Sequence, residues 1–179
     1  MPLILILGLP STGKTSIAKA LSKALPEKPI YLNTDLIRRK LFNFSEHHYT
    51  SFNTSIYTQE NRILVYNALY LLTDILLSLN LTIILDGTFY SKETRKPLYE
   101  MCNRQNQKLF IIKTSCSDDT VKQRIYERKK HGKDVSDADF SIYEEFKKKF
   151  EPLTLNHLVV DTSKDISQNL QEVKEFLET

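Results

Sequence analysis

The residues best suited to chemistry form a short loop, GLPSTGKT, which begins at Gly8 and lies between an apolar run and a segment with helical spacing. The loop matches GxxxxGK[ST], in which backbone N–H groups converge on a phosphate at the N-terminus of a helix. Gly8 and Gly13 allow that curvature, and Pro10 stiffens the loop. We expect Lys14 to neutralise β- and γ-phosphate oxygens and Thr15 to offer its hydroxyl group to Mg²⁺. The pattern therefore predicts binding of ATP and Mg²⁺.

The whole loop is a candidate contact surface for the nucleotide. Its members are Gly8, Pro10, Ser11, Thr12, Gly13, Lys14, Thr15 and Ser16. A glycine turn without function is the alternative, but a strand before the loop and a helix after it are the context that the motif requires. Such a loop serves switches, motors and kinases alike, so the other reactive residues must decide between them.

A carboxylate and a guanidinium stand three residues apart after the second apolar run. Asp35 and Arg38 belong to YLNTDLIRRKL, where this spacing predicts one face of a helix. Asp35 can accept the proton of an acceptor hydroxyl group while Arg38 holds an anionic part of the same substrate. The alternative is that Thr34 and Asp35 only cap the helix. Arg39 points away from this face, and we expect it to be solvated.

Asp86 closes the most apolar strand predicted in the chain, LTIILDGTF, which has the pattern of a Walker B motif. It can hold Mg²⁺ through water or orient the acceptor; the alternative is a carboxylate satisfied by backbone N–H groups at a turn. Thr88 and Arg95 follow on the same loop and can line an acceptor pocket. For Arg95, a surface salt bridge is an equally good interpretation.

Two arginines lie four residues apart before a polar segment. Arg124 and Arg128 share one face of a predicted helix, and a short lid, approximately residues 127–139, follows from the polar sequence ERKKHGKDVSDAD. A moving lid would bring these guanidinium groups onto the nucleotide phosphates, where they stabilise charge in the transition state. An ordinary solvated face is the alternative, because neighbouring acidic residues partly balance the charge.

Composition limits the class of protein. The 179 residues fit one domain, 1–179, and the net charge of +3 lacks the basic excess of a dedicated duplex-DNA binder. Two cysteines without CxxC spacing are typical of a reducing compartment, so we expect a cytoplasmic location. The apolar start has no basic residue before it, and the longest apolar window contains Asp74 and Asn80, so neither export nor a membrane span is expected. The oligomeric state does not follow from the sequence.

Short apolar runs alternate with segments of helical spacing. Five strands are predicted at Leu3–Leu7, Ile30–Leu32, Leu81–Leu85, Lys108–Lys113 and His157–Val160. Helices are predicted at Thr15–Leu25, Leu36–Phe42, Gln59–Leu79, Lys92–Asn103, Thr120–Lys130, Ala138–Phe150 and Ile166–Leu177. This order predicts an α/β fold, a three-layer α/β/α sandwich around a five-stranded parallel sheet, with ligands at the carboxyl ends of the strands. Pro97 predicts a kink or a late start of its helix.

The sequence resembles the P-loop kinases of the polynucleotide kinase-like group, small kinases related to adenylate kinase, gluconate kinase and chloramphenicol phosphotransferase. The resemblance spans nearly the whole chain. It rests on LGLPSTGKTSIAKAL, NTDLIRRKLF, YTQENRILVYNAL, IILDGTFYSKETR, RIYERKKHGKDVSDADFSIYEEFKKKFEP and VVDTS. One departure is Ser11, which replaces the commoner glycine of the loop; its side chain can point away from the phosphates.

The resemblance implies an adenylate kinase-type core with an arginine-bearing lid. It makes Asp35 the general base, Arg38 the contact to an anion on the acceptor, and Arg128 the lid arginine on the phosphates. Arg124 would then lie on or near the adenine. The first alternative acceptor is a nucleic-acid 5′ end, because the phage-type 5′-hydroxyl kinases look similar at the Asp35, Arg38, Asp86 and Arg128 positions.

We therefore predict an ATP- and Mg²⁺-dependent kinase that phosphorylates a hydroxyl group of a small molecule or nucleotide. Phosphorylation of nucleic-acid 5′ ends is the first alternative and would require stacking surfaces for bases. Tyr49, Phe52, Tyr57 and Phe89 are candidates for that role, although core positions suit them better. A nucleotide-binding switch or ATPase without an acceptor is the second alternative, and the Asp35–Arg38 pair argues against it.

Overall fold

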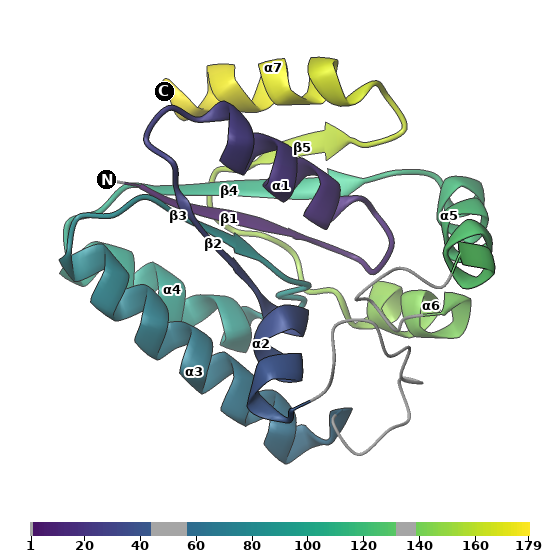
Figure 1. The fold of residues 1–179 in the computed structure, drawn as a ribbon, viewed down its shortest axis with the longest axis horizontal. Helices are drawn as coiled ribbons and strands as arrows, with labels where there is room; N and C mark the ends of the chain where they lie inside the picture. The colour runs from purple at the N-terminus through teal and green to yellow at the C-terminus, as the bar shows by residue number, and fades with distance from the viewer. Residues whose placement is uncertain (1, 44–56, 132–138) are drawn as a thin grey trace.

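The computed structural model describes residues 2–43, 57–131 and 139–179. Its centre is a parallel sheet in the order β2-β3-β1-β4-β5 (Figure 1). The strands are β1 (Leu3–Gly8), β2 (Ile30–Asn33), β3 (Ile83–Asp86), β4 (Leu109–Ser115) and β5 (Leu158–Asp161). All five predicted strands are present, and every neighbouring pair is parallel, so the predicted fold class is confirmed.

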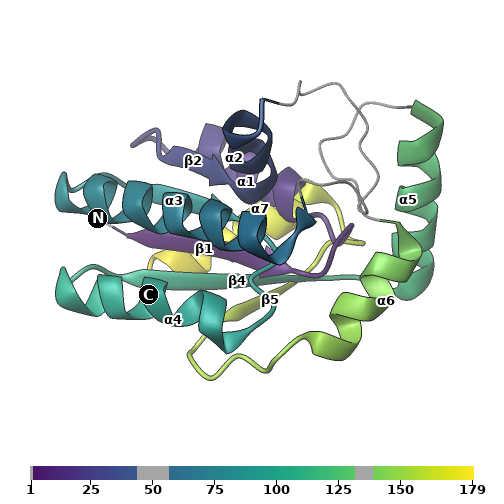
Figure 2. The ribbon, with the colours of Figure 1, turned by 90° about the horizontal axis from the view of Figure 1, so that it is seen from below.

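Helices cover both faces of the sheet. They are α1 (Lys14–Ala24), α2 (Thr34–Leu41), α3 (Gln59–Ser78), α4 (Lys92–Arg104), α5 (Asp118–His131), α6 (Phe140–Lys149) and α7 (Ile166–Leu177). Helices α1 and α7 lie on one face, and α3 and α4 lie on the other (Figures 1 and 2). Helices α5 and α6 stand beyond the carboxyl end of β4, outside the layers. Helices α5 and α6 therefore stand near the edge where ligands are expected.

The two core layers follow from the alternation of side chains along β1. Leu3, Leu5 and Leu7 point toward α3 and α4, where they pack in one buried cluster. Ile4 and Ile6 point to the opposite face and pack against α1 and α7. A strand buried on both sides needs apolar residues at every position, which is why LILIL carries no polar residue.

The sequence-based expectations for the starts of α2 and α4 need correction. Helix α2 begins at Thr34, two residues early, because the side chain of Asn33 accepts hydrogen bonds from the backbone N–H groups of Asp35 and Leu36. Thr34 and Asp35 therefore do not cap the helix. Helix α4 begins at Lys92, as its predicted range has it, and Pro97 lies inside it, so the alternative of a late start at Pro97 is wrong and the kink stays a prediction.

Candidate nucleotide site and the pocket beside it

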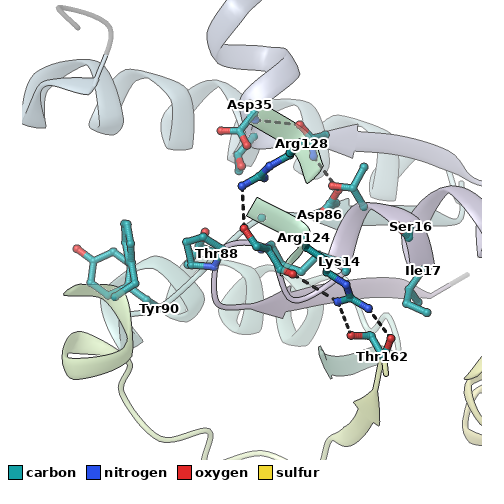
Figure 3. Close-up of a pocket in the computed structure, with 18 of the residues that line it drawn as sticks. Lys14, Ser16, Ile17, Asp35, Asp86, Thr88, Tyr90, Arg124, Arg128 and Thr162 are labelled. Carbon is teal, nitrogen blue, oxygen red and sulfur yellow. Dashed lines mark hydrogen bonds between the residues drawn. The ribbon is translucent and has the colours of Figure 1, made fainter. Parts of the chain in front are cut away.

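A pocket of about 720 Å³ opens at the carboxyl ends of the strands. Its wall includes the loop after β1, the starts of α1 and α2, the end of β3, and residues of α3, α5, α6 and α7. Figure 3 shows Lys14 near its centre, Tyr90 on one side, and Ile17 with Thr162 on the other. The pocket thus extends to both sides of the loop predicted to bind phosphate.

The glycines of this loop occupy positions that other residues would strain. Gly13 has φ +86° at the start of α1, and a Cβ atom at Gly8 would lie 2.6 Å from Thr114 Oγ1. The side chain of Thr12 is buried beneath the loop, where it shares a hydrogen bond of 2.7 Å with Thr114 Oγ1 and donates one to Leu9 O. Gly8 and Thr12 do not line the pocket among the described residues, so they shape the loop from behind.

The remaining loop residues face the pocket. Pro10, Ser11, Gly13, Lys14, Thr15 and Ser16 all line it. Lys14 Nζ donates a 2.8 Å hydrogen bond to Leu9 O, so the ammonium group folds back over the loop. Ser11 has φ +64°, a left-handed conformation that is uncommon for a residue with a side chain. Its Oγ atom accepts a 2.9 Å hydrogen bond from Arg128 Nη2, so the side chain faces α5.

Asp86 is held by three donors from three different elements. Its Oδ2 atom accepts hydrogen bonds from Thr15 Oγ1 at 2.7 Å, Tyr31 Oη at 2.8 Å and Asn33 Nδ2 at 2.7 Å. Burial first, and then the charge of Asp86, raise the pKa of Tyr31 above its ordinary value, so Tyr31 stays protonated and donates. Backbone N–H groups at a turn, the alternative considered for Asp86, are not its printed partners; side chains are.

The oxygen atoms of Asp86 and Thr15 fit a magnesium ion. Asp86 is 1% exposed, and its Oδ1 atom is buried without a hydrogen-bond partner among the described residues. The hydroxyl group of Thr15 lies beside it, and Mg²⁺ prefers oxygen ligands of this kind. The described residues contain no group of three or more His, Cys, Asp or Glu side chains suited to a metal. A single carboxylate and a hydroxyl group suit an ion that keeps water and phosphate oxygens as its other ligands.

Asp35 and Arg38 meet on the pocket wall. Arg38 Nη1 donates to Asp35 Oδ1 at 2.5 Å, and side-chain exposure is 9% for Arg38 and 32% for Asp35. The guanidinium carbon of Arg38 lies 4.6 Å from the ring centroid of Tyr57, which also lines the pocket. Arg39 is 1% exposed, so the expectation that it is solvated is wrong.

Thr88 lines the pocket, but Arg95 does not. The Arg95 side chain is 1% exposed and donates to the carbonyl oxygens of Phe89, Tyr90, Glu151 and Pro152 at 2.8, 3.1, 3.1 and 3.0 Å. Both interpretations of Arg95, as an acceptor contact and as a surface salt bridge, are therefore corrected. It joins the β3–α4 loop to the segment after α6.

Helix α5 carries two arginines to the pocket. Arg124 Nη2 donates to Thr162 O at 2.6 Å, and Arg124 Nη1 donates to Thr162 Oγ1 at 3.0 Å (Figure 3). Arg128 reaches the loop at Ser11. Both arginines line the pocket rather than a solvated face, although most of the predicted lid lies outside the described residues, at 132–138.

Residues 3–153 match the protein family of AAA domains. This chain belongs to that family. The AAA domain also has the fold of several solved structures. The predicted resemblance to P-loop kinases is thus confirmed for the fold. None of the curated proteins compared with the chain matches it. Within the described ranges, no helix is long and apolar enough to cross a membrane.

Three solved structures illustrate the likeness. Kti12 of Chaetomium thermophilum, in complex with ADP-AlF3, is 22% identical with a TM-score of 0.73, covering 99% of this chain and 98% of its own. A gluconokinase from Sinorhizobium meliloti is 14% identical with a TM-score of 0.70, covering 99% and 91%. The Mycobacterium tuberculosis APS kinase CysC, in complex with AMPPNP and APS, is 17% identical with a TM-score of 0.69, covering 99% and 98%.

Several residues of the site in this AAA domain were not found from the sequence; Tyr31 does not line the pocket but contacts Asp86, which does. Asn33 and Tyr31 bond Asp86, Thr162 binds Arg124, and Arg62 Nη1 donates to Tyr90 Oη at 3.3 Å. The rule that ligands bind at carboxyl ends of strands points to Asn33 and Thr162, which end or follow β2 and β5. No local pattern marks Arg62, which lies one turn into a long helix.

The aromatic candidates separate into two groups. Phe89 is fully buried in the core, as favoured from the sequence. Tyr57 lines the pocket, where Arg38 covers its ring. Tyr49 and Phe52 lie outside the described residues.

Proposed function

We propose that this AAA domain is an ATP- and Mg²⁺-dependent kinase that transfers the γ-phosphoryl group to a hydroxyl group of a small molecule or nucleotide. The observation that carries the proposal is the Asp35–Arg38 pair on the wall of the pocket that contains the phosphate-binding loop. A switch without an acceptor needs no carboxylate–guanidinium pair beside its γ-phosphate. The solved P-loop kinases of the same fold, and the nucleotides in two of the related structures, support it.

The loop residues and Asp86 would hold the nucleotide. Backbone N–H groups at the start of α1 would bind the β-phosphate, and Lys14 would leave Leu9 O to neutralise the phosphate oxygens. Thr15 and Asp86 would hold Mg²⁺, which when bound neutralises charge on the β- and γ-phosphates. Arg124 and Arg128 would add positive charge from α5, Arg128 over the phosphates.

Asp35 would act as the general base. In the transfer, the acceptor oxygen forms a bond to the γ-phosphorus, its proton passes to Asp35, and the bond from that phosphorus to the β,γ-bridging oxygen breaks to release ADP. Arg38 would hold the Asp35 carboxylate in place through their 2.5 Å contact. The Arg38 side chain lines the pocket and would contact an anion on the acceptor.

A second candidate acceptor is the 5′-hydroxyl end of a nucleic acid. Tyr57, Tyr90 and Phe146 line the same pocket as Arg38 and Arg62, and aromatic rings beside guanidinium groups suit a base and its phosphate. The two acceptor classes differ in salt dependence, because a polynucleotide contacts several cationic residues.

Labelled ATP and a panel of acceptors test the proposal. Purified protein is incubated with nucleosides, sugars, amino-alcohols, antibiotics and 5′-hydroxyl oligonucleotides, and transfer of label is measured. Asp35→Asn should lower transfer by about 10²–10⁴-fold with little change in ATP affinity, because it removes only the base. Lys14→Ala should weaken both. Asp119→Asn is the matched control, because that side chain is 93% exposed on α5 and should change neither. Full transfer by Asp35→Asn would contradict the base assignment.

A further inference from the structure

Exposed apolar side chains gather on one side of the molecule. Of the twelve large apolar residues that are exposed in the described parts of the chain, eight lie on α2, on α3 or in the segment directly after α3. Helices α2 and α3 pack beside each other (Figures 1 and 2), and both line a groove of about 320 Å³. We call the outer surface of these two helices the α3 patch. Its main members are Leu41, Leu64, Leu71, Leu72, Ile75 and Leu79.

Helix α3 is apolar on both faces. Its inner face packs in the core through Leu69 and Leu77, which are fully buried. Its outer face carries most of the α3 patch, whose main members are 42–63% exposed. The run 63–73 contains no charged residue, and Asp74 beyond it pairs with Arg104 at 2.6 Å. A surface helix of a single domain normally has a polar outer face, whereas a helix that is apolar all round is normally buried on both sides, so we expect the α3 patch to be covered in the working protein.

The charges around the α3 patch distinguish between the possible covers. A helix that lies on a membrane surface carries Lys and Arg on its polar side. Arg62 is the only basic residue of α3, and it lines the pocket instead. Glu60 and Asp74 are acidic, which disfavours contact with anionic lipids. A partner that docks through charge would meet none among the main members of the patch, whereas a second copy of this chain offers the same uncharged surface.

The size of the α3 patch fits a dimer interface. With Ile63 and Leu81, the exposed fractions of its members add up to about four whole leucine-sized residues. This corresponds to apolar surface on the order of 700 Å², against about 800 Å² for one partner in a specific interface of standard size. The walls of the groove, which include Phe42, Asn67 and Ala68, add to this area. Two such patches in contact are therefore large enough for a specific complex.

We infer that two copies of this chain associate through the α3 patch, with their α3 helices antiparallel about a twofold axis. In such a contact both copies use the same surface, and each contact between different residues occurs twice. Leu71 lies near the middle of the patch, seven residues after Leu64 and eight before Leu79. The axis therefore passes near Leu71, so that the two Leu71 side chains meet and Leu64 of each copy lies near Leu79 of the other. This inference depends neither on ATP binding nor on the proposed phosphoryl transfer.

Sedimentation equilibrium of the purified chain tests the inference. Wild type should have the mass of a dimer at about 100 μM, because interfaces of standard size have dissociation constants in the μM range or below. Leu71→Lys and Leu71→Glu should each have the mass of a monomer, since two like charges would meet at the axis. Leu71 is 63% exposed, so both variants should keep the fold, which far-UV circular dichroism and thermal unfolding verify. Tyr126→Lys is the matched control, because Tyr126 is 70% exposed on α5, away from the patch, and this variant should keep the dimer mass.

Mixing the two Leu71 variants tests the position of the axis. An equimolar mixture of Leu71→Lys and Leu71→Glu should regain the mass of a dimer, because opposite charges then face each other across the axis. A mixture that stays monomeric would overturn the antiparallel arrangement about Leu71.

Other covers of the α3 patch would give different results. A wild-type chain that stays monomeric at about 100 μM would overturn the inference, and so would a dimer that both Leu71 variants leave intact. If wild type sedimented with phosphatidylcholine vesicles and Leu71→Lys did not, the cover would be a membrane surface, and the inference would again be overturned.

Discussion

Arg95 has a structural role that its position in the chain does not indicate. It donates to four carbonyl oxygens from two separate segments, residues 89–90 and 151–152, and it is 1% exposed. A guanidinium group has five donors in a fixed plane, so it can satisfy several carbonyl groups that a neutral side chain cannot. Arg95 is thus a structural residue that holds the β3–α4 loop in place.

Replacing Arg95 should therefore reduce stability and leave nucleotide binding unchanged. Arg95→Met keeps much of the apolar stem but leaves four carbonyl oxygens without their donor, and we expect a loss of at least about 3 kcal/mol in the free energy of unfolding. Denaturant unfolding and ATP titration measure the two effects. Lys96→Met is the control, since that side chain is 72% exposed and should change stability by less than about 0.5 kcal/mol. If Arg95→Met kept its stability but bound the acceptor more weakly, the interpretation of Arg95 as an acceptor contact would be supported instead.

The parts of the site that were predictable are those marked by local patterns. The loop around Lys14 and the aspartate at the end of β3, Asp86, follow from motifs. The rule for carboxyl ends of parallel strands predicts that the loop and Asp86 lie close together, as the Thr15–Asp86 hydrogen bond shows. Tyr31 and Asn33 were not predictable, because their bonds to Asp86 depend on β2 lying next to β3, a strand order that no local sequence states.

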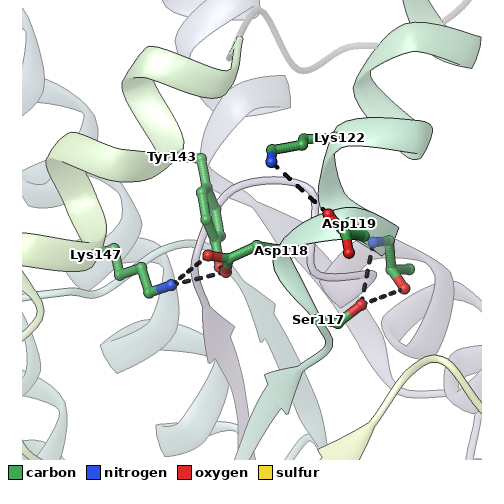
Figure 4. A network of polar contacts seen from close by, with 7 residues as sticks. Ser117, Asp118, Asp119, Lys122, Tyr143 and Lys147 are labelled. Carbon is green, nitrogen blue, oxygen red and sulfur yellow. Dashed lines mark hydrogen bonds and ion pairs between the residues drawn. The ribbon is translucent and has the colours of Figure 1, made fainter.

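At the scale of elements, Asp118 joins the two helices that stand outside the sandwich. It lies in the first turn of α5 and accepts hydrogen bonds from Tyr143 Oη at 2.7 Å and Lys147 Nζ at 2.7 Å, both on α6 (Figure 4). These hydrogen bonds hold the pKa of Asp118 below its ordinary value. Because α5 carries Arg124 and Arg128, this contact helps to set where those arginines lie.

The lowered pKa predicts the pH range in which Asp118 contributes. Its stabilising effect is present above its ordinary pKa of 3.8 and is lost as the pH falls below that value. Asp118→Ala should therefore speed hydrogen exchange of the α6 amides at pH 7, and the difference from wild type should shrink as the pH falls below 3.8. Asp119→Ala, on the same turn but 93% exposed, is the control and should exchange like wild type. A difference that persists at low pH would rule out the charge of Asp118 as its cause.

The order and type of the elements followed from sequence, whereas the exact start of several helices did not. The apolar runs and helical periods are local, so five strands and seven helices were found in their order. The start of α2 depends on the Asn33 side chain turning back onto the helix, although the same side chain also bonds Asp86 through its nitrogen. The role of Asn33, which has one partner in β3 and another in α2, can be recognised only when the positions of both partners are known.

At the scale of the molecule, the pocket joins residues from six helices and two strands, so a bound nucleotide should stabilise the whole fold. A ligand at about 100 times its dissociation constant adds about 2.7 kcal/mol to the free energy of unfolding. We expect ATP with Mg²⁺ to give a gain of this size and ATP with a chelator to give a smaller one, measured by denaturant unfolding. Asp86→Asn should remove the difference between the two conditions, because it removes the charge that holds the ion. Equal stabilisation with and without Mg²⁺ in wild type would contradict the proposed metal site.

Ser11 links the phosphate-binding loop to helix α5. Its backbone adopts a conformation that a glycine would adopt without cost, while its hydroxyl group tethers Arg128. Exchange for glycine would relax the loop and remove this side-chain hydrogen bond, while Arg124 Nη1 would still donate to Ser11 O. The serine therefore adds a side-chain link between the phosphate-binding loop and α5, at the cost of a left-handed backbone conformation that is uncommon for a residue with a side chain.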